Sequence, residues 1–214
     1  MIIRRVAVYV LGLFVLSLGV AFSIISMLGV SPVSSVAYVL NNVTGLTIGT
    51  VTIIEFSIYV LIQLLLLKRD FKIKSFLQVL FGTVFGIFVD LSLFITNTLE
   101  ANSMGAQVIY LILSIVLIAL GLVLILTADI VPNAPEGLML AIQKVTKFKF
   151  SNIKTVFDSS CVLFSSIVAL LLLNSFTDSG IWVGTFVTAL LVGKVLGIFM
   201  TKLKKPVLAF INVT

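Results

Sequence analysis

Residues 106–128 read AQVIYLILSIVLIALGLVLILTA and contain no charged side chain. A helix needs roughly 20 apolar residues to cross the hydrocarbon core of a bilayer, so this stretch is long enough to span a membrane. Five further stretches of similar character occupy residues 6–28, 49–67, 75–96, 152–173 and 181–202. Because backbone polar groups in lipid must find partners within their own segment, we predict that all six stretches are helices.

The composition of the whole chain agrees with a membrane protein. Of its 214 residues, 60% are hydrophobic and 10% are charged, whereas soluble domains carry about a quarter charged residues. The chain has no histidine and one cysteine, Cys161, so it can form neither an intrachain disulfide nor a Cys/His metal cluster. We therefore predict an all-α, polytopic membrane bundle, and we expect no metal and no cofactor.

Two further apolar stretches, residues 32–43 and 135–146, are much shorter than the others. At about a dozen residues each, they are too short to span comfortably, which is typical of re-entrant segments. Each opens with a proline, and Ser31 and Asn133 stand just before these prolines. Ser and Asn cap helix N-termini and Pro suits the first turn, so both stretches are predicted to be short helices.

The two halves of the chain share rare residue types at a nearly constant separation of 102 or 103 residues. The matches are Leu18 and Gly19 with Leu120 and Gly121, Pro32 with Pro135, Glu55 with Asp158, and Gly82 and Thr83 with Gly184 and Thr185. We interpret this as a tandem duplication, with one repeat at residues 1–104 and the other at 105–214. The first apolar stretch has a counterpart inside the chain, so it is predicted to be a structural helix rather than a signal peptide.

Thirteen of the 14 Lys and Arg residues lie in four clusters, at residues 4–5, 68–74, 144–154 and 202–205. With six crossings and two re-entrant segments, all four clusters face the cytoplasm, as do both termini. If the short segments also spanned, there would be eight crossings and the cluster at 68–74 would face outside. Each repeat then has three crossings, and because this number is odd the two repeats are inserted into the membrane in opposite orientations. This is the inverted-repeat design of many secondary transporters. The net charge of +6 is then explained by topology and anionic lipid, with no nucleic acid as a partner.

Apart from the basic residues near the helix ends, four charged residues fall within the predicted spanning helices, namely Glu55, Asp90, Asp158 and Lys194. Each costs at least roughly 2.5 to 3.5 kcal/mol at mid-bilayer, so each is expected to face the bundle interior or a wet cavity. We predict an ion pair of Asp158 with Lys194 and a carboxylate pair of Glu55 with Asp90. Two close carboxylates cannot both ionise easily, so this pair would hold a proton or a cation and could couple transport to protons. The alternative is that these charges only hold helices together.

Polar residues of the short segments are a second group of candidates. They are Ser31, Ser34 and Tyr38 in the first segment, and Asn133 and Glu136 in the second. A helix N-terminus inside the membrane presents free N–H groups and a partial positive charge, which favours an anionic or zwitterionic solute. Glu136 is compatible with a substrate contact and also with capping of its own helix.

Five motifs are spread over the chain: LGVSP at residues 28–32, GLTIGT at 45–50, PEGLM at 135–139, FD at 157–158 and GT at 184–185. This combination resembles the YczE/YitT-like family of bacterial integral membrane proteins over most of the chain. That family is largely uncharacterised. The resemblance therefore implies a fold and a compartment, the bacterial inner membrane, rather than a substrate.

These observations together predict a small-solute transporter or permease that works by alternating access of two inverted repeats, with an unidentified substrate. The alternatives are a membrane substrate-binding subunit of a larger importer and a regulatory membrane protein that transports nothing. The sequence contains no recognisable pair of a nucleophile and a general base, and no phosphate-binding loop. We therefore do not expect the protein to be an enzyme. The expected partners are the lipid bilayer and a small solute, and the sequence leaves a homodimer open.

Overall fold

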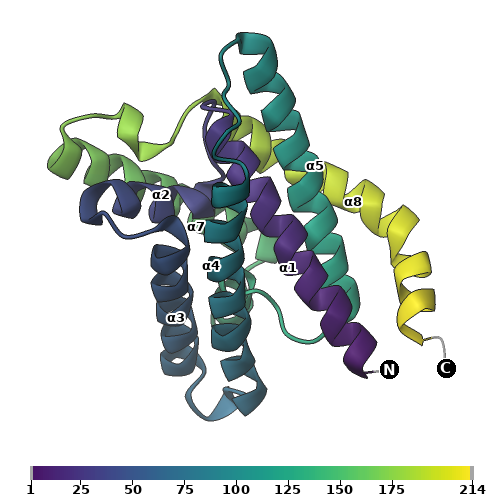
Figure 1. Ribbon diagram of the computed structural model, residues 1–214. Helices are drawn as coiled ribbons and strands as arrows, with labels where there is room; N and C mark the ends of the chain where they lie inside the picture. Colours follow the sequence, from purple (N-terminus) through teal and green to yellow (C-terminus); the bar gives the residue numbers. More distant parts are fainter. Residues whose placement is uncertain (1, 213–214) are drawn as a thin grey trace. The chain divides into compact units, whose positions relative to one another are not determined.

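A computed structural model describes residues 2–212, and the chain in this range is helical and contains no strand (Figure 1). The α-helices are α1 (Ile2–Ile25), α2 (Pro32–Thr44), α3 (Ile48–Leu67), α4 (Leu77–Ile95), α5 (Met104–Ala128), α6 (Ala134–Thr146), α7 (Phe150–Val168) and α8 (Val183–Asn212). Short 3-10 turns occur at Lys68–Asp70, Ile73–Phe76 and Thr177–Ser179, and a π turn at Ala169–Leu173 extends α7.

Six helical segments in the described range are long and apolar enough to cross a membrane, which confirms the six long apolar helices predicted from the sequence. They contain α1, α3, α4, α5, α7 and α8. The largest departure from the sequence-based bounds is in α8, which continues beyond residue 202 to Asn212 with Pro206 inside it. Its basic residues end the apolar stretch but not the helix, because Lys is a good helix former.

The two short segments form helices of 13 residues each, α2 and α6. Ser31 directly precedes α2, and Asn133 is the N-cap residue of α6, as predicted. The side chain of Asn133 makes no capping hydrogen bond, however, so the predicted capping role is wrong. Pro135 occupies the second position of the helix and has no N–H group there for a cap to bind.

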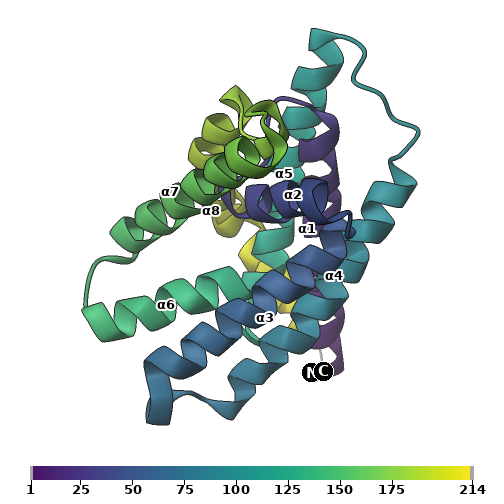
Figure 2. The ribbon, with the colours of Figure 1, turned by 90° about the vertical axis from the view of Figure 1, so that its left-hand side faces the viewer.

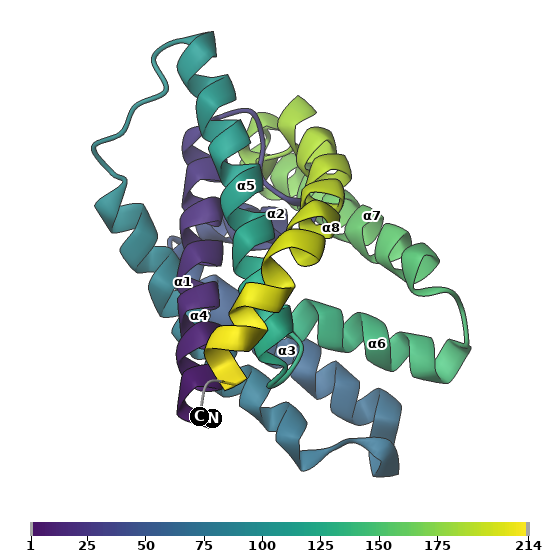
Figure 3. The ribbon, with the colours of Figure 1, turned by 90° about the vertical axis from the view of Figure 1, so that its right-hand side faces the viewer.

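The described residues form two compact units, and unit 1 comprises residues 2–31, 87–130 and 180–212. Its centre is the contact of α1 with α5, and α5 also packs against α8 (Figure 3). A Cβ added at Gly19 would lie 2.7 Å from Ile118, and one added at Gly121 would lie 2.6 Å from the backbone N of Leu16. Residues later in α1 thus contact residues earlier in α5, so the two helices are antiparallel and touch where glycine removes the side chain.

The N-terminal end of α1 and the C-terminal end of α8 lie at the same end of unit 1 (Figures 1 and 3). Arg4 and Arg5 belong to the first of these helix ends, and Lys202, Lys204 and Lys205 to the second. Two of the four basic clusters are therefore at one end of this unit.

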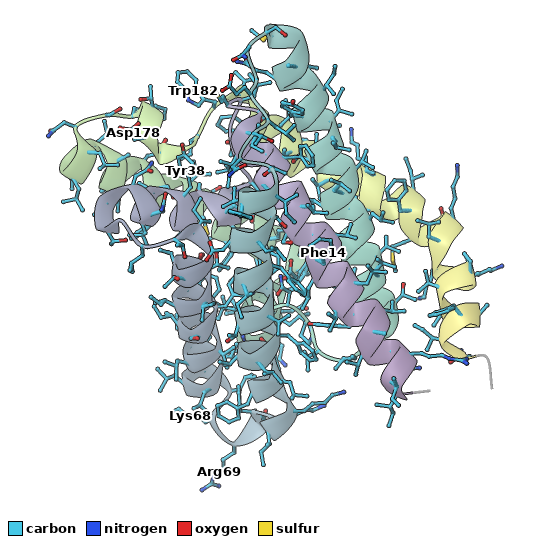
Figure 4. The ribbon with its side chains drawn as sticks, in the orientation of Figure 1. Phe14, Tyr38, Lys68, Arg69, Asp178 and Trp182 are labelled. Atoms are coloured by element: carbon cyan, nitrogen blue, oxygen red, sulfur yellow. The ribbon has the colours of Figure 1, made fainter. Side chains whose placement is uncertain are left out.

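Unit 2 comprises residues 32–86 and 131–179. In it α2 packs against α7, and α6 packs against α3 (Figure 2). The first part of α4 approaches α3 closely, since a Cβ added at Gly86 would lie 2.6 Å from the carbonyl oxygen of Gly49. Lys68 and Arg69 lie at one end of unit 2, and Tyr38 and Asp178 at the other (Figure 4).

Each compact unit combines helices from both halves of the sequence. Unit 1 contains α1 from the first half and α5 and α8 from the second, whereas unit 2 contains α2 and α3 from the first half and α6 and α7 from the second. The compact units therefore do not coincide with the predicted repeats at 1–104 and 105–214. Those repeats stay a prediction about how the sequence is organised.

Candidate functional site

Unit 2 contains a cavity of about 370 Å³ between α2, α3 and α7. Most of its wall is apolar, with side chains from all three helices. The apolar lining residues include Leu40 of α2, Ile54 and Ile58 of α3, and Phe157 and Phe164 of α7. Glu55, Tyr59, Ser160 and Cys161 supply the polar atoms. A cavity with a few polar groups on an apolar wall is typical of small-molecule sites.

The helical period explains why these residues meet at one cavity. On α3, the lining residues Val51, Glu55, Ile58 and Tyr59 recur at steps of three or four, which places them on one face of the helix. The lining residues of α7, 157, 160, 161 and 164, follow the same steps. The two faces point toward each other, because the ring centroids of Tyr59 and Phe157 are 5.5 Å apart at an angle of 65°.

Glu55 is the charged group of the cavity, and its side chain is buried, with 6% of the residue exposed. The hydroxyl of Tyr59 donates a hydrogen bond to Oε1 of Glu55. The ion pairs found among residues 2–212 do not include Glu55. A carboxylate taken out of water without a cationic partner is costly, so such a group holds a proton or binds a cation. Glu55 is thus a buried acid on the cavity wall that takes part in none of the ion pairs described for residues 2–212.

The other two polar residues of the wall are Ser160 and Cys161. The hydroxyl of Ser160 donates to the carbonyl oxygen of Val156 at 2.8 Å. Cys161 is a buried free thiol that interacts with Tyr59. The sequence contains no histidine that could act as a base beside either group.

A second buried polar group joins α3, α4 and the start of α6. The side-chain amides of Gln63 and Gln78 bond to each other in both directions, at 2.9 and 3.2 Å, and are 2% and 3% exposed. Gln63 also donates to the carbonyl oxygen of Ala134 at 3.3 Å. A Cβ added at Gly137 would lie 2.6 Å from Oε1 of Gln78. The amide pair thus fixes the first turn of the short helix α6.

A third polar group connects α6 with α7. Lys154 and Asp158 form an ion pair of 2.9 Å one helical turn apart, and both act electrostatically on Glu136. Oδ1 of Asp158 and Oε2 of Glu136 are buried and have no hydrogen-bond partner among the described residues. The ion pair of Lys154 is with Asp158.

The structure locates the four predicted intramembrane charges as follows. Glu55 lies in unit 2 and Asp90 in unit 1, so their pairing stays a prediction. Asp158 forms its ion pair with Lys154, which the sequence analysis missed although the two residues are one turn apart. Lys194 is exposed on α8 in unit 1, and its pairing with Asp158 also stays a prediction.

The candidates in the short segments lie away from the cavity wall. Ser34 and Tyr38 are half-buried on α2, but Val36 and Leu40 are the residues of this helix that line the cavity. Asn133 and Glu136 belong to the start of α6, and Ser31 precedes α2. Tyr59, Gln63 and Gln78 were not among the residues predicted from the sequence. A signal existed for Tyr59, because it follows Glu55 by four residues on one helix face.

The helices and the cavity define a polytopic α-helical membrane protein. The chain belongs to a family of unknown function, DUF6198, which matches residues 3–201. It is similar to the uncharacterized protein YyaS of Bacillus subtilis (strain 168), with 30% identity over 193 residues that cover 90% of each chain. No solved structure matches the chain. An uncharacterised family agrees with the sequence-based expectation, whereas the YczE/YitT-like name is not confirmed.

Proposed function

We propose that this protein is a small-solute transporter or permease of the bacterial inner membrane, with its solute site in the cavity of unit 2. The observation that carries the proposal is Glu55, a carboxylate 6% exposed on the wall of a cavity of about 370 Å³. Ionisable residues inside a membrane are expensive and are found where they serve a solute, an ion or a proton. A charge needed only to hold helices together would have a basic partner, and the described ion pairs give Glu55 none.

The contact of α1 with α5 supports two inverted repeats. Gly19 faces Ile118, and Gly121 faces Leu16. Gly121 follows Gly19 by 102 residues, and Ile118 follows Leu16 by the same number. Each contact is therefore the image of the other, as expected across a two-fold axis. Because equivalent helices of the two halves run antiparallel, the two repeats have opposite orientations.

The contacts of the short helices support the same relation. In the first half, α2 is joined to α7 through the hydroxyls of Ser35 and Ser165, 2.9 Å apart. In the second half, α6 is joined to α3 through Gln63 and the carbonyl of Ala134. Ser165 follows Gln63 by 102 residues, so matching positions of α3 and α7 hold the short helix of the opposite half.

The ends of the short helices support re-entry on opposite sides of unit 2. Lys144, near the end of α6, forms an ion pair of 2.9 Å with Asp70 in the turn between α3 and α4. Asn42, near the end of α2, donates to the carbonyl of Asp178 in the turn after α7, at 3.1 Å. Lys68 and Asp178 lie at opposite ends of the unit (Figure 4). A helix of 13 residues is about 20 Å long, short of the roughly 30 Å of hydrocarbon, so each one returns to its own side.

The charge distribution gives the orientation. The end of unit 2 at Lys68 and Lys144 holds two basic clusters, whereas residues 27–47 and 174–182 contain no Lys or Arg. By the positive-inside rule, the basic end faces the cytoplasm and the end at Asp178 faces outside. In unit 1 the two helix ends with basic clusters are also together, which supports a cytoplasmic position for both termini.

The mechanism follows from a single acid on the apolar wall of the cavity. Glu55 holds either a proton or a positively charged group, so binding of one displaces the other. Access to the cavity alternates between the two sides, as in other proteins with inverted repeats. Exchange at Glu55 then links movement of the solute to movement of a proton.

A thermal-shift screen of the purified protein against a solute library tests the proposal. A solute that binds the native state stabilises it by mass action. We expect at least one class of solute to raise the unfolding temperature of the parent and not that of Glu55→Gln, and we expect the same class to cross proteoliposomes that contain the protein alone. Copurification with an ATPase pair and no flux by the isolated chain would indicate a substrate-binding subunit of an importer. Full tolerance of Glu55→Gln would point to a regulatory protein.

A further inference from the structure

The composition of the cavity wall restricts the chemistry of the ligand. Glu55 brings one negative charge, and no Lys or Arg is among the residues that line the cavity. Three aromatic rings, those of Tyr59, Phe157 and Phe164, come from the two helices that face each other. A carboxylate beside aromatic faces attracts a cation through charge and through the ring quadrupoles.

A bare inorganic cation does not fit this wall. Such ions need several oxygen ligands to replace their water, commonly six or more for Ca²⁺ and about six for Mg²⁺. Apart from the carboxylate, the wall offers the hydroxyls of Tyr59 and Ser160. Each of these already donates a hydrogen bond, to Glu55 and to the carbonyl of Val156 respectively. The apolar majority of the wall favours instead a cation that is weakly hydrated and carries its own apolar groups.

The rim of the cavity is apolar as well. Ile54 and Ile58 are each 48% exposed, and Phe164 is 45% exposed. These residues lie in helices that are long and apolar enough to span a membrane, so an exposed rim of this kind is suited to contact with lipid. A ligand that enters here passes apolar side chains before it meets Glu55, which again favours an amphiphilic cation over a strongly hydrated one.

We infer that the cavity between α2, α3 and α7 binds a small organic cation with an apolar body, such as an alkyl- or arylammonium ion, whose charge pairs with Glu55. This inference rests on the proposed function for its site, but it concerns recognition and is tested by binding rather than by flux. It replaces the expectation of an anionic solute, which was based on the helix N-termini. The start of α6 is occupied by the amides of Gln63 and Gln78 and carries Glu136, so an anion would meet a carboxylate there.

Equilibrium dialysis of the full chain in detergent with three radiolabelled probes of similar size tests this inference. The probes are benzyltrimethylammonium, the anion phenylpropionate and the neutral phenylpropanol. We expect the parent to bind the cation about tenfold to a hundredfold more tightly than the other two, the range of one charge-assisted contact. Glu55→Gln should lose this preference and keep the weak binding of phenylpropanol, which shows that the variant is folded. Glu100→Gln, in an exposed loop, is the matched control and should behave as the parent.

Two further measurements locate the bound cation. Leu40→Trp keeps the carboxylate but fills the cavity, so it should weaken binding of the cation even if Glu55→Gln fails to fold. Cys161 lines the cavity and is the only cysteine of the sequence, so bound benzyltrimethylammonium should slow its reaction with N-ethylmaleimide. The inference is overturned if the parent prefers phenylpropionate, if it binds none of the probes, or if Leu40→Trp and a folded Glu55→Gln retain the preference for the cation.

Discussion

The hydroxyl of Tyr59 donates a hydrogen bond to Oε1 of Glu55, one turn earlier on α3, and both side chains line the same cavity. A phenol is a donor that brings no positive charge of its own. It therefore orients the carboxylate and leaves the charge of Glu55 available to a ligand. An Arg or Lys in the same place would neutralise the acid and would favour a structural role. The pair makes Tyr59 a positioning residue for the site.

Tyr59→Phe removes the donor and keeps the ring that packs against Phe157. The carboxylate then loses the hydrogen bond that fixes its rotamer. We expect binding of benzyltrimethylammonium to weaken by roughly tenfold, since hydrogen bonds to charged groups contribute about 1.5 to 3 kcal/mol. Binding of phenylpropanol should not change. Equal losses for both probes in equilibrium dialysis would show that Tyr59 only shapes the cavity.

Because Gln63 and Gln78 bond to each other, we expect mutations of the two residues to have strongly non-additive effects on the free energy of unfolding. Gln63→Leu leaves the buried amide of Gln78 without its partner, and should lower the free energy of unfolding by about 1 to 3 kcal/mol. The double variant Gln63→Leu with Gln78→Leu removes both polar groups and should recover part of that loss. Reversible unfolding in mixed micelles measures the double-mutant cycle. Additive losses would mean that the two amides do not stabilise each other.

The antiparallel contact of α1 with α5 depends on glycine at position 121. A Cβ added there would lie 2.6 Å from the backbone N of Leu16, which can move only with its helix. We expect Gly121→Ala to destabilise the protein despite the better helix propensity of Ala, which is worth about 1 kcal/mol. Gly193→Ala on α8 is the matched control, because no atom lies within 4 Å of its added Cβ. It should be neutral or stabilising. The same thermal shift for both variants would contradict the close contact.

Re-entry predicts that the chain enters and leaves each short helix from the same side of the membrane. In a Cys161→Ser background, single cysteines at Met27 and Gly45, on either side of α2, should react with an impermeant maleimide from outside. Cysteines at Asn133 and Lys147, at either end of α6, should react from the cytoplasmic side. Labelling of intact cells and of inverted vesicles measures this. Opposite accessibility of the two ends of either helix would show that it spans.

The sequence predicted the helices well because apolar length is a local property. Residues 32–43 and 135–146 were identified as short helices from their length and their prolines, and α2 and α6 agree with them closely. The end of α8 could not be predicted, because the run of lysines marks the membrane boundary and a helix continues beyond it. Which helices touch, and so the composition of the two compact units, is a property of the tertiary structure.

The candidate site was only partly predictable for the same reason. Glu55 was found because a charge in an apolar stretch is conspicuous. Gln63 and Gln78 are neutral, and nothing in the sequence shows that two amides 15 residues apart meet across a turn. The cavity itself needs three helices, α2, α3 and α7, to be placed side by side. Its apolar wall resembles any other helix face in the sequence.

The central claim is that Glu55 in this cavity is the exchange site of a transporter, and flux of a permanently charged solute tests it most directly. The purified chain would be reconstituted into the membrane of proteoliposomes that have an acidic lumen. Radiolabelled benzyltrimethylammonium, which cannot cross the bilayer as a neutral base, would be added outside. We expect the cation to accumulate with the parent and with Glu100→Gln, and a protonophore to abolish this accumulation. We expect no accumulation with Glu55→Gln. Binding without flux in the parent, or equal flux in Glu55→Gln, would contradict it.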